Sequence, residues 1–285
     1  MPLAKETFTL IHAALAEDMA GEDLTSLATI ALGQEGEAII TAKADGVISG
    51  IAIAKEVFHT SDASIGQQWL ATDGDLIKTG DTVGRLKGSL HALLSAERTA
   101  MNFLQHLSGI ATATRAYVEA IKGTGCMVAD TRKTTPGLRH LEKQAVQHGG
   151  GINHRMDLAS GMLIKENHII ASGGIADAIH DCYTFNLRTG HEVWIEAECE
   201  TLEEVAEAVS VSPDIILVDN MSPEDVARAR AIVPKSILLE ASGGITLENA
   251  RSYAETGVDR IAIGAITHSA PALDLSMRIA STKKP

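Results

Sequence analysis

Aromatic residues, cysteines and long apolar runs are all scarce in this sequence of 285 residues. Phe, Trp and Tyr make up 3% of it, so stacking platforms for nucleobases are few. The three cysteines form no C-x-x-C pair and predict neither a disulfide framework nor a zinc ribbon. No apolar run approaches the roughly 20 residues that span a bilayer, and the N-terminal stretch soon reaches Glu17 and Asp18, unlike a signal peptide. We therefore expect a soluble cytoplasmic protein.

Basic residues are also fewer than acidic residues. There are 24 Lys and Arg against 37 Asp and Glu, a net charge of −13, so we expect neither nucleic acid nor a membrane as a partner. Residues 130–168 are the exception, with six basic and four acidic residues, while the remaining 18 basic and 33 acidic residues give −15. This +2 segment suits a small anion, because arginine binds carboxylates through two parallel hydrogen bonds and lysine supplies a point charge. We expect two of its bases, Arg139 and Lys143, on a solvated helix surface.

The first third of the chain has the pattern of a small α+β unit. Apolar spacing predicts an amphipathic helix over residues 5–19 and then a loop at residues 21–26. Gly-Asp turns and β-like runs predict an antiparallel sheet between residues 36 and 88; the runs are residues 37–43, 46–54, 67–72 and 81–88. A helical pattern follows over residues 89–121. Since this exceeds the usual helix length, we expect a break near Gly109 and a domain boundary there.

After residue 124, short apolar runs alternate with helical segments, which is typical of a parallel sheet covered by helices on its outside. The runs are residues 126–130, 161–165, 193–198, 214–220, 236–242 and 260–265. A capping box at Thr201 and Glu204, and Ser222 before Pro223, mark helix starts between them. The last four strand ends recur every 21 to 23 residues. This compact spacing favours an α/β barrel.

Each apolar run ends at residues that can carry chemistry. In a β/α barrel the carboxyl ends of the parallel strands face the active site. One polar strand end is an ordinary transition into a loop, but six in succession favour a site. The ends are Asp130 to Lys133, Lys165 to His168, Glu196 and Glu198, Asp219 and Asn220, Glu240 to Gly244, and Gly264.

Two of these ends suggest a phosphate site. Ser242, Gly243 and Gly244 follow one strand and precede a helix, where glycines let the backbone approach a phosphate. Gly264 and Ala265 follow the next strand, a position where barrels often complete a phosphate cup. Neither a Walker A sequence nor a dinucleotide fingerprint is present, so ATP hydrolysis and dinucleotide redox chemistry are poor candidates.

Glu198 and Asp219 end neighbouring strands. Two close carboxylates can act as an acid/base pair or hold Mg²⁺ together with phosphate oxygens, and the phosphate ligands nearby favour Mg²⁺. The sequence has no zinc-ligand spacing and no nucleophile elbow. His154, beside Arg155, could bind a carboxylate or a ring nitrogen, and on residue type alone it could equally be structural.

The segment DTRKTTPGLRHLEKQAVQHGGGINHRMDLASGMLIKENHI, residues 130–169, closely resembles the bacterial quinolinate phosphoribosyltransferases, or nicotinate-nucleotide pyrophosphorylases (carboxylating). The resemblance continues in residues 16–26 and 93–115 and in WIEAECETLEEV, IILVDN, LLEASGGIT and ALDLSMR. It implies an N-terminal α/β sandwich domain over residues 1–108 and an α/β barrel over residues 109–269. The tail, residues 270–285, is expected to pack back on the first domain.

The resemblance also implies the reaction. The phosphoribosyl group of 5-phosphoribosyl 1-pyrophosphate passes to quinolinate with decarboxylation, giving nicotinate mononucleotide, pyrophosphate and CO₂ for de novo NAD biosynthesis. Mg²⁺ is the implied cofactor and a homodimer the implied assembly.

The family motifs imply a role for each matching residue. Arg132, His154, Arg155 and Lys165 hold the two carboxylates of quinolinate, with Thr131 also binding substrate and Arg98 reaching in from the neighbouring subunit. Lys133, Glu198 and Asp219 are the catalytic residues and engage the phosphoribosyl substrate. Glu198 and Asp219 hold its Mg²⁺ directly or through water. Ser242, Gly243, Gly244, Gly264 and Ala265 cradle the 5-phosphate.

Two segments depart from the family pattern. The chain reads GEDLTS where the family has G-D-L-T, and IEAECE where the family has Val-Glu-Val-Glu. In the second segment we expect Glu198 in the site and assign Glu196 to the opposite face of the strand.

Three alternatives stay open. The acceptor could be nicotinate, although a molecule lacking the 2-carboxylate would leave the site over-charged. The chain could be a non-catalytic relative on the same fold, such as a molybdenum-transport-associated protein, although none of the four bases Arg132, Lys133, Arg155 and Lys165 is lost. An aldolase-type barrel could form a Schiff base on Lys165, although the dense neighbouring bases disfavour it.

Overall fold

The computed structural model describes residues 4–19 and 22–283, and the chain divides into two compact units. Unit 1 comprises residues 1–113, 136–149 and 270–285, and unit 2 comprises residues 114–135 and 150–269. The division between residues 113 and 114 falls inside one long helix. Residues 136–149, which the sequence analysis placed in the barrel, belong to unit 1.

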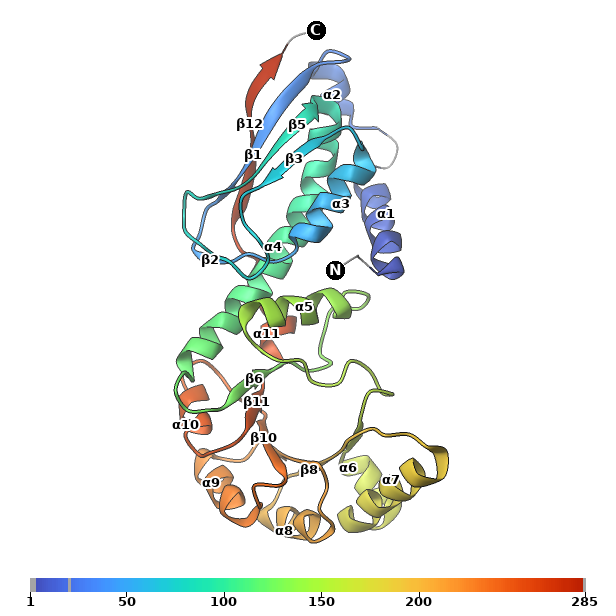
Figure 1. The fold of residues 1–285 in the computed structure, drawn as a ribbon, viewed down its shortest axis with the longest axis vertical. Helices are drawn as coiled ribbons and strands as arrows, with labels where there is room; N and C mark the ends of the chain where they lie inside the picture. The colour runs from blue at the N-terminus through green and yellow to red at the C-terminus, as the bar shows by residue number, and fades with distance from the viewer. Residues whose placement is uncertain (1–3, 20–21, 284–285) are drawn as a thin grey trace. The chain divides into compact units, whose positions relative to one another are not determined.

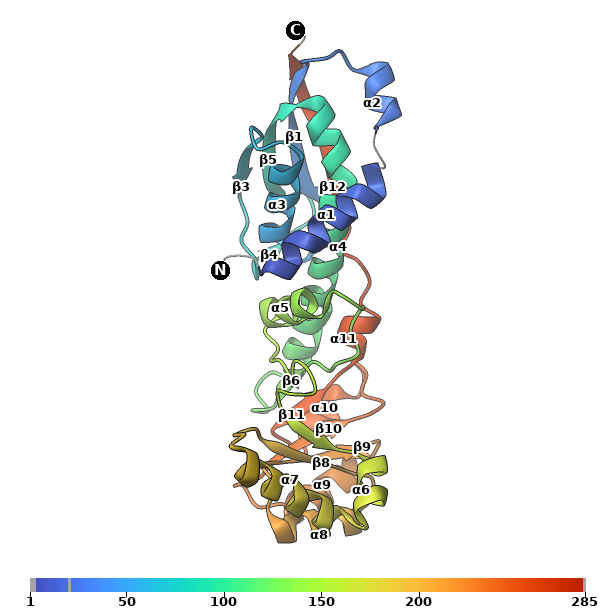
Figure 2. The ribbon, with the colours of Figure 1, turned by 90° about the vertical axis from the view of Figure 1, so that its right-hand side faces the viewer.

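Unit 1 is built on an antiparallel sheet of four strands in the order β12-β1-β5-β3. The strands are β1 (Glu35–Ala42), β3 (Gly66–Trp69), β5 (Thr82–Ser89) and β12 (Leu275–Lys283). Along β1, the fully buried Ala38, Ile40 and Ala42 alternate with more exposed residues, so one face of the sheet is packed. Helices α1 (Lys5–Met19), α3 (Ile51–Ser61) and the first part of α4 (Leu90–Ala120) cover it (Figures 1 and 2).

The C-terminal strand β12 completes this sheet. It pairs with β1 from Glu35 opposite Lys283 to Ala42 opposite Leu275. A smaller ladder joins β2 (Gly46–Val47) to β4 (Leu76–Ile77). The helix predicted over residues 5–19 is confirmed as α1.

Two local predictions for unit 1 are wrong. Residues 46–54 form β2 and the start of α3 rather than a strand, because Gly50 turns the chain with a φ of 99° and Asp73 accepts the N–H of Ile51 at 2.9 Å. The loop predicted at residues 21–26 contains the start of α2 (Leu24–Thr29), which Asp23 caps by accepting the N–H of Ser26 at 3.0 Å. Within that loop, Gly21 lies outside the described residues.

The break predicted near Gly109 is also wrong, because α4 runs without interruption through this residue. A Cβ atom at Gly109 would lie 2.2 Å from the carbonyl oxygen of Pro271. This glycine therefore permits the close approach of the segment that leads to β12. A glycine inside a helix costs only about 1 kcal/mol relative to alanine, which the packing of a long helix can offset.

Unit 2 contains a parallel sheet of six strands in the order β6-β11-β10-β9-β8-β7. The strands are β6 (Met127–Ala129), β7 (Met162–Ile164), β8 (Ile195–Cys199), β9 (Ile215–Asp219), β10 (Leu238–Ser242) and β11 (Arg260–Ala262). They confirm the six apolar runs. An isolated parallel bridge joins Ala129 to Ile152 beside β6. The arrangement is barrel-like, as the sequence predicted.

Helices line the outside of this sheet (Figure 1). Those of unit 2 are α6 (Glu166–Ser172), α7 (Ile175–Thr189), α8 (Leu202–Val211), α9 (Pro223–Ile232), α10 (Ala250–Ala254) and α11 (Ala265–His268). The predicted helix starts are confirmed: Thr201 and Glu204 form a capping box on α8, and Ser222 caps α9 with Pro223 in its first turn. Helix α5 (Arg139–Gly149) belongs to unit 1.

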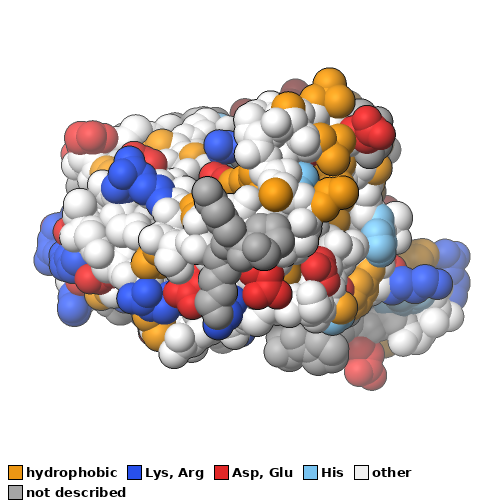
Figure 3. Space-filling view, turned by 90° about the horizontal axis from the view of Figure 1, so that it is seen from above, with side chains coloured by type: hydrophobic (Ala, Val, Ile, Leu, Met, Phe, Trp, Pro, Cys, Tyr) orange, Lys and Arg blue, Asp and Glu red, His pale blue; other side chains and the backbone are white. Residues whose placement is uncertain are grey.

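Among the described residues, no helix has both the length and the apolar character needed to cross a membrane. On the face drawn in Figure 3, Lys and Arg side chains are interspersed with Asp and Glu, and apolar side chains gather toward one edge.

Candidate active site

The carboxyl ends of the parallel strands in unit 2 surround a cavity of about 370 Å³, a size typical of small-molecule sites. Nine predicted site residues line it: Thr131, Arg132, Lys133, His154, Arg155, Lys165, Glu198, Asp219 and Ser242. The other lining residues are Leu163, Leu217, Glu240 and Ala262. Residues from seven segments of the sequence thus meet in one place, which we call the strand-end pocket.

The pocket is lined by both cationic and acidic side chains. The segment after β6 supplies Arg132 and Lys133, and the segment before β7 supplies Arg155. The carboxylates of Glu198 and Asp219 come from the ends of β8 and β9. Separate positive and negative groups can bind an anion and a cation side by side.

Lys165 follows β7 and caps helix α6, and its ammonium group contacts the carboxylate of Glu198. The Lys165 side chain is 48% exposed and that of Glu198 14% exposed. The pair therefore lies at the mouth of the pocket, where water and salt screen it. Either partner can be drawn to a ligand of higher charge.

Asp219 is held by its neighbour Asn220, whose side-chain amide donates to it at 2.6 Å. Asn220 adopts a positive φ of 56° and packs against the glycine loop after β10. A Cβ atom on Gly243 would lie 2.2 Å from Asn220 Oδ1, and Gly243 itself has a φ of 90°. A side chain at position 243 is therefore excluded by both space and backbone conformation.

The Arg155 guanidinium is held by a hydrogen bond to the backbone. Its Nη1 donates to the carbonyl oxygen of Gly161 at 3.0 Å. Burial, and then the nearby positive charge of Arg132, lowers the pKa of the Arg155 guanidinium. Two like charges held close together gain from an anion placed between them.

The loop that carries Arg155 is anchored on a buried carboxylate. Asp130, at the end of β6 and fully buried, accepts the backbone N–H of His154 at 2.9 Å and the side-chain amide of Asn153 at 2.6 Å. These two hydrogen bonds give Asp130, the polar residue that follows β6, a structural role. Asp130 supports the loop rather than lining the pocket.

Four glycine and alanine positions predicted for the site lie beside the lining. A Cβ atom on Gly264 would lie 3.1 Å from Cδ of Lys133, so the Lys133 side chain passes directly over this glycine. Ala265 is the first residue of α11. Gly243 and Gly244 follow Ser242, and the Cβ position of Gly244 is open, with nothing within 4 Å.

The remaining predicted residue, Arg98, is exposed on helix α4 within unit 1. Its predicted role across a subunit interface stays a prediction. The surface position expected for Lys143 is wrong: this side chain is fully buried, as is that of the adjacent Glu142. Arg139, on the same helix, is half-buried.

The assignment of Glu196 to the opposite face from Glu198 is also wrong. Residues two apart in a strand share a face, and Glu196 points inward, where His154 Nε2 lies 2.9 Å from its Oε2. In the interior, Arg260 contacts both Glu196 and Glu240, a grouping that was not predicted from the sequence. The available signal was the presence of three charged residues inside otherwise apolar runs of neighbouring strands.

A second cavity, of about 410 Å³, shares Arg155 and Leu163 with the strand-end pocket. It is otherwise lined mainly by β7 and by helices α6 and α7, with apolar residues such as Met162, Ile164 and Phe185. Its one fixed cation is Arg155. The strand-end pocket is therefore the candidate active site.

The comparisons with known proteins agree with this geometry. The model of the quinolinate phosphoribosyl transferase N-terminal domain matches residues 23–108, and that of the C-terminal domain matches residues 110–278. A probable nicotinate-nucleotide pyrophosphorylase [carboxylating] of Bacillus subtilis is 44% identical, over 92% of this chain and 90% of its own length. The Mycobacterium leprae nicotinate-nucleotide pyrophosphorylase [carboxylating] is 39% identical, over 94% and 95%.

A solved structure shows the same similarity in three dimensions. The nicotinate-nucleotide pyrophosphorylase of Francisella tularensis superposes with a TM-score of 0.93 at 36% identity, covering 98% of both chains. Both family domains, in order and over nearly the whole length, are thus present. The chain belongs to the quinolinate phosphoribosyl transferase family.

Proposed function

We propose that this protein transfers the phosphoribosyl group of 5-phosphoribosyl 1-pyrophosphate to quinolinate and removes the 2-carboxyl group as CO₂. The products are nicotinate mononucleotide and pyrophosphate. One observation carries the proposal: a single pocket combines several cationic side chains with the carboxylates of Glu198 and Asp219, on a chain whose two domains both match this family. A dicarboxylate and a phosphorylated sugar with its metal ion require these two kinds of group together.

Three of the cationic side chains are assigned to quinolinate. Arg132, Arg155 and Lys165 would bind its two adjacent carboxylates, with Thr131 alongside. Support comes from the charge repulsion between Arg132 and Arg155, which a dianion relieves. Nicotinate has one carboxylate fewer and would leave part of this positive charge uncompensated, so we favour quinolinate as the acceptor.

The phosphoribosyl substrate is assigned to Lys133 and to the loops after β10 and β11. Lys133 would engage its pyrophosphate, and Ser242, Gly243, Gly244, Gly264 and Ala265 would surround its 5-phosphate. The absence of a side chain at Gly264 gives Lys133 its path into the pocket, and the open Cβ position of Gly244 leaves room for a phosphate to approach the backbone.

Glu198 and Asp219 are the residues that would hold Mg²⁺, directly or through water. Carboxylate oxygens suit this ion, which also takes phosphate oxygens and keeps several waters. The donor set fits, because both carboxylates line the pocket from neighbouring strands. When bound, Mg²⁺ supplies positive charge that stabilises the leaving pyrophosphate.

In this reaction the protein mainly orients the two substrates and stabilises charge. The C1–O bond to pyrophosphate breaks as the pyridine nitrogen of quinolinate bonds to C1, with oxocarbenium character at the ribose. The carboxylates of Glu198 and Asp219 would stabilise the positive charge that develops at C1. The C2 carboxyl then leaves as CO₂, the cationic ring nitrogen stabilises the electron pair left on C2, and a proton takes its place. Positioning of the two substrates supplies most of the rate.

The direct test uses the purified protein with 5-phosphoribosyl 1-pyrophosphate, Mg²⁺ and quinolinate labelled in its 2-carboxyl group. We expect equal amounts of labelled CO₂ and nicotinate mononucleotide, and little product when nicotinate replaces quinolinate. A protein that forms neither product would be a non-catalytic relative on this fold. Borohydride trapping of a carbonyl substrate on Lys165 would instead indicate an aldolase.

We further propose that the protein acts in the cytoplasm as a homodimer in which Arg98 of one subunit serves the site of the other. Mixed dimers test this. The Arg98→Ala and Arg132→Ala variants would each be nearly inactive alone, but a mixed dimer would carry one intact site. Random subunit exchange would then restore about one quarter of the wild-type activity. If the mixture stayed inactive although mixed dimers had formed, Arg98 would act within its own subunit or not at all.

A further inference from the structure

The residue that follows Asp219 contacts two separate parts of the site assigned to the phosphoribosyl donor. Asn220 has a φ of 56°, in the left-handed region that asparagine tolerates better than most side chains. Its side-chain amide donates to Asp219 Oδ2 at 2.6 Å, and its backbone N–H donates to the carbonyl oxygen of Ser242 at 2.9 Å. One residue thus contacts both the carboxylate assigned to Mg²⁺ and the strand end that leads into the glycine loop assigned to the 5-phosphate.

The orientation of the Asn220 amide follows from its neighbours. A carboxylate accepts hydrogen bonds and does not donate them, so the amide nitrogen faces Asp219 and Oδ1 faces Gly243. A Cβ atom on Gly243 would lie 2.2 Å from this Oδ1 and 2.8 Å from the Asn220 backbone nitrogen. The glycine loop can therefore lie this close to Asn220 only because position 243 has no side chain.

Two further contacts tie the segment after β9 to the segments around the glycine loop. Asp219 pairs with Ser242 in the register of the parallel strands β9 and β10. Beyond the loop, the buried Tyr253 of α10 donates through its hydroxyl to the carbonyl oxygen of Met221 at 3.0 Å. Asn220 thus lies between two neighbours that are both anchored.

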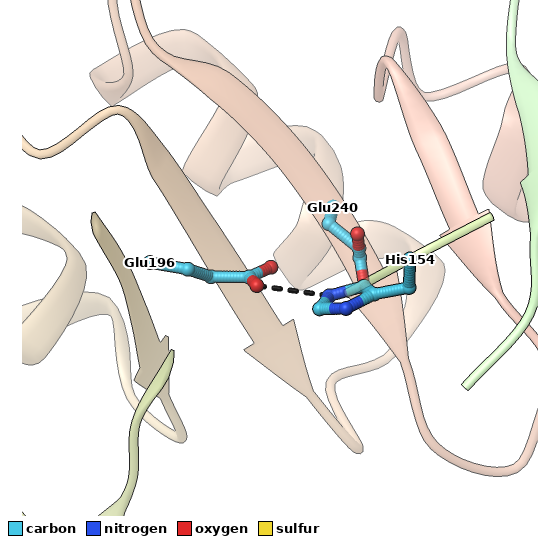
Figure 4. Close-up of side chains that lie close together, drawn as sticks. All are labelled: His154, Glu196 and Glu240. Atoms are coloured by element: carbon cyan, nitrogen blue, oxygen red, sulfur yellow. Dashed lines mark ion pairs between the residues drawn. The ribbon is translucent and has the colours of Figure 1, made fainter. Parts of the chain in front are cut away.

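The strand before the glycine loop is anchored in the interior. Glu240, two residues before Ser242, is fully buried and contacts Arg260 on β11. Figure 4 shows the Glu240 side chain extending from β10 beside the imidazole of His154. The end of β10 is therefore a rigid support for Ser242 and for the loop that follows it.

A second asparagine holds the other end of the loop. The side chain of Asn249 donates to the carbonyl oxygen of Gly244 at 3.0 Å and accepts the N–H of Thr246 at 2.8 Å. These two contacts lie within residues 244–249, whereas the contacts of Asn220 join the loop to Asp219.

We propose that Asn220 is a positioning residue for the phosphoribosyl donor. Its amide orients the Asp219 carboxylate, and its packing on Gly243 keeps that carboxylate in register with the glycine loop. The two ends of one substrate then meet groups that are fixed in one geometry. Asn220 acts through Asp219 and the loop rather than on the reacting atoms. The inference rests on the proposed function, because it concerns residues assigned to the donor and its Mg²⁺.

Two fragments of the donor test the link without turnover. Ribose 5-phosphate probes the glycine loop, and pyrophosphate with Mg²⁺ probes the end of the site that contains Asp219. Calorimetry measures both fragments on the wild type and on Asn220→Gly, which leaves the backbone free to adopt a positive φ. We expect both fragments to bind about tenfold more weakly, the scale of one hydrogen bond to a charged group. Weaker binding of only one fragment, or of neither, would overturn the proposal.

Asn249→Ala is the matched control, because the side-chain contacts of Asn249 lie within the loop. It should weaken ribose 5-phosphate and leave pyrophosphate with Mg²⁺ within about twofold of the wild type. Equal weakening of both fragments would mean that any disturbance of the loop spreads through the site, which would contradict a special role for Asn220. Quinolinate binding should stay within about twofold in both variants. A parallel loss of quinolinate in Asn220→Gly would indicate general loosening and would also overturn the proposal.

The two glycines of the loop give a second test that keeps Asn220 and does not depend on the folding of Asn220→Gly. At Gly243 a new Cβ would displace the Asn220 side chain, whereas at Gly244 it would meet open space. Gly243→Ala should therefore weaken the binding of pyrophosphate with Mg²⁺ several-fold, and Gly244→Ala should not. When Asn220→Gly is already present, Gly243→Ala should add less than about twofold. An equal loss in both backgrounds would show that Gly243 acts independently of Asn220 and would contradict the proposal.

Steady-state kinetics separate this role from the proposed reaction. In Asn220→Gly the KM for 5-phosphoribosyl 1-pyrophosphate should rise about tenfold, while the KM for quinolinate stays within about twofold. If the wild type bound both fragments but formed no product from quinolinate, the proposed function would fail, and fragment binding would still decide the role of Asn220. If the wild type bound neither fragment, the donor site and the role of Asn220 would both be wrong.

Discussion

The ammonium group of Lys165 contacts the carboxylate of Glu198, so a cation assigned to quinolinate is neutralised by a carboxylate assigned to Mg²⁺. The two groups come from the ends of adjacent strands, β7 and β8. Binding of both substrates would separate them, each moving to a ligand of opposite charge. The pair therefore keeps opposite charges together until the substrates arrive.

Replacing Glu198 by glutamine separates catalysis from acceptor binding. We expect kcat to fall about 100-fold or more, the usual cost of removing one group that stabilises charge in the transition state. Quinolinate affinity without the phosphoribosyl donor should stay equal or become a few-fold tighter, because Lys165 loses its competing partner. Steady-state kinetics and calorimetry measure the two quantities.

The matched control for that variant is Glu203→Gln, at an exposed position in the first turn of α8. It should leave both quantities unchanged. Weaker quinolinate binding in Glu198→Gln would mean that Glu198 supports the acceptor site rather than the donor site.

Replacing Arg132 by alanine should raise the KM for quinolinate by about 10- to 100-fold, since a hydrogen bond between charged groups is worth about 1.5–3 kcal/mol. The KM for the phosphoribosyl donor should change less than twofold. Initial rates with each substrate varied in turn measure this. Arg228→Ala, at an exposed arginine on α9, is the control. An equal effect on both substrates would contradict the role of Arg132.

The two glycines after Ser242 should respond differently to alanine. At Gly243, the new Cβ would collide with Asn220, whereas at Gly244, with a φ of 62°, it would meet open space. We expect Gly244→Ala to lose about 1 kcal/mol of unfolding free energy from backbone strain, and Gly243→Ala to lose clearly more. Urea unfolding measures both. Similar losses would show that Asn220 can move aside, and Asp219 with it.

Glu240 should make stability depend on pH. Burial, and then the negative charge of Glu196, raises its pKa from 4.5 to about 7 against the opposing effects of Arg260 and His154. The folded state thus favours the protonated acid. Its contribution is fully present below pH 4.5 and is lost as pH rises toward and through 7.

The variant Glu240→Gln removes that titration. The difference in unfolding free energy between wild type and variant should change by up to about 3 kcal/mol between pH 5 and 8, with the wild type losing relative stability as pH rises. Urea unfolding at several pH values measures this. A constant difference across the range would mean that Glu240 keeps one protonation state throughout.

Periodicity alone predicted most of the unit 2 sheet, because buried parallel strands are short apolar runs and their carboxyl ends converge on one edge. Seven of the nine predicted residues that line the pocket lie at these strand ends, and the family resemblance added His154 and Arg155. The sequence alone predicted that Arg132, Lys165, Glu198 and Asp219 are site residues, because polar side chains at the ends of buried strands lie outside the packed core.

Tertiary contacts decided the rest. Gly109 lies inside helix α4, where the segment at Pro271 packs against it. Helix α3 begins at Ile51, whose N–H is accepted by Asp73, more than 20 residues away. No local pattern carries this information, since each partner is distant in the chain. The sequence by itself determined which residues carry charge at the strand ends. Only the folded chain decided that Glu196 and Glu240 meet Arg260 in the interior, because these residues lie on different strands that are far apart in the sequence.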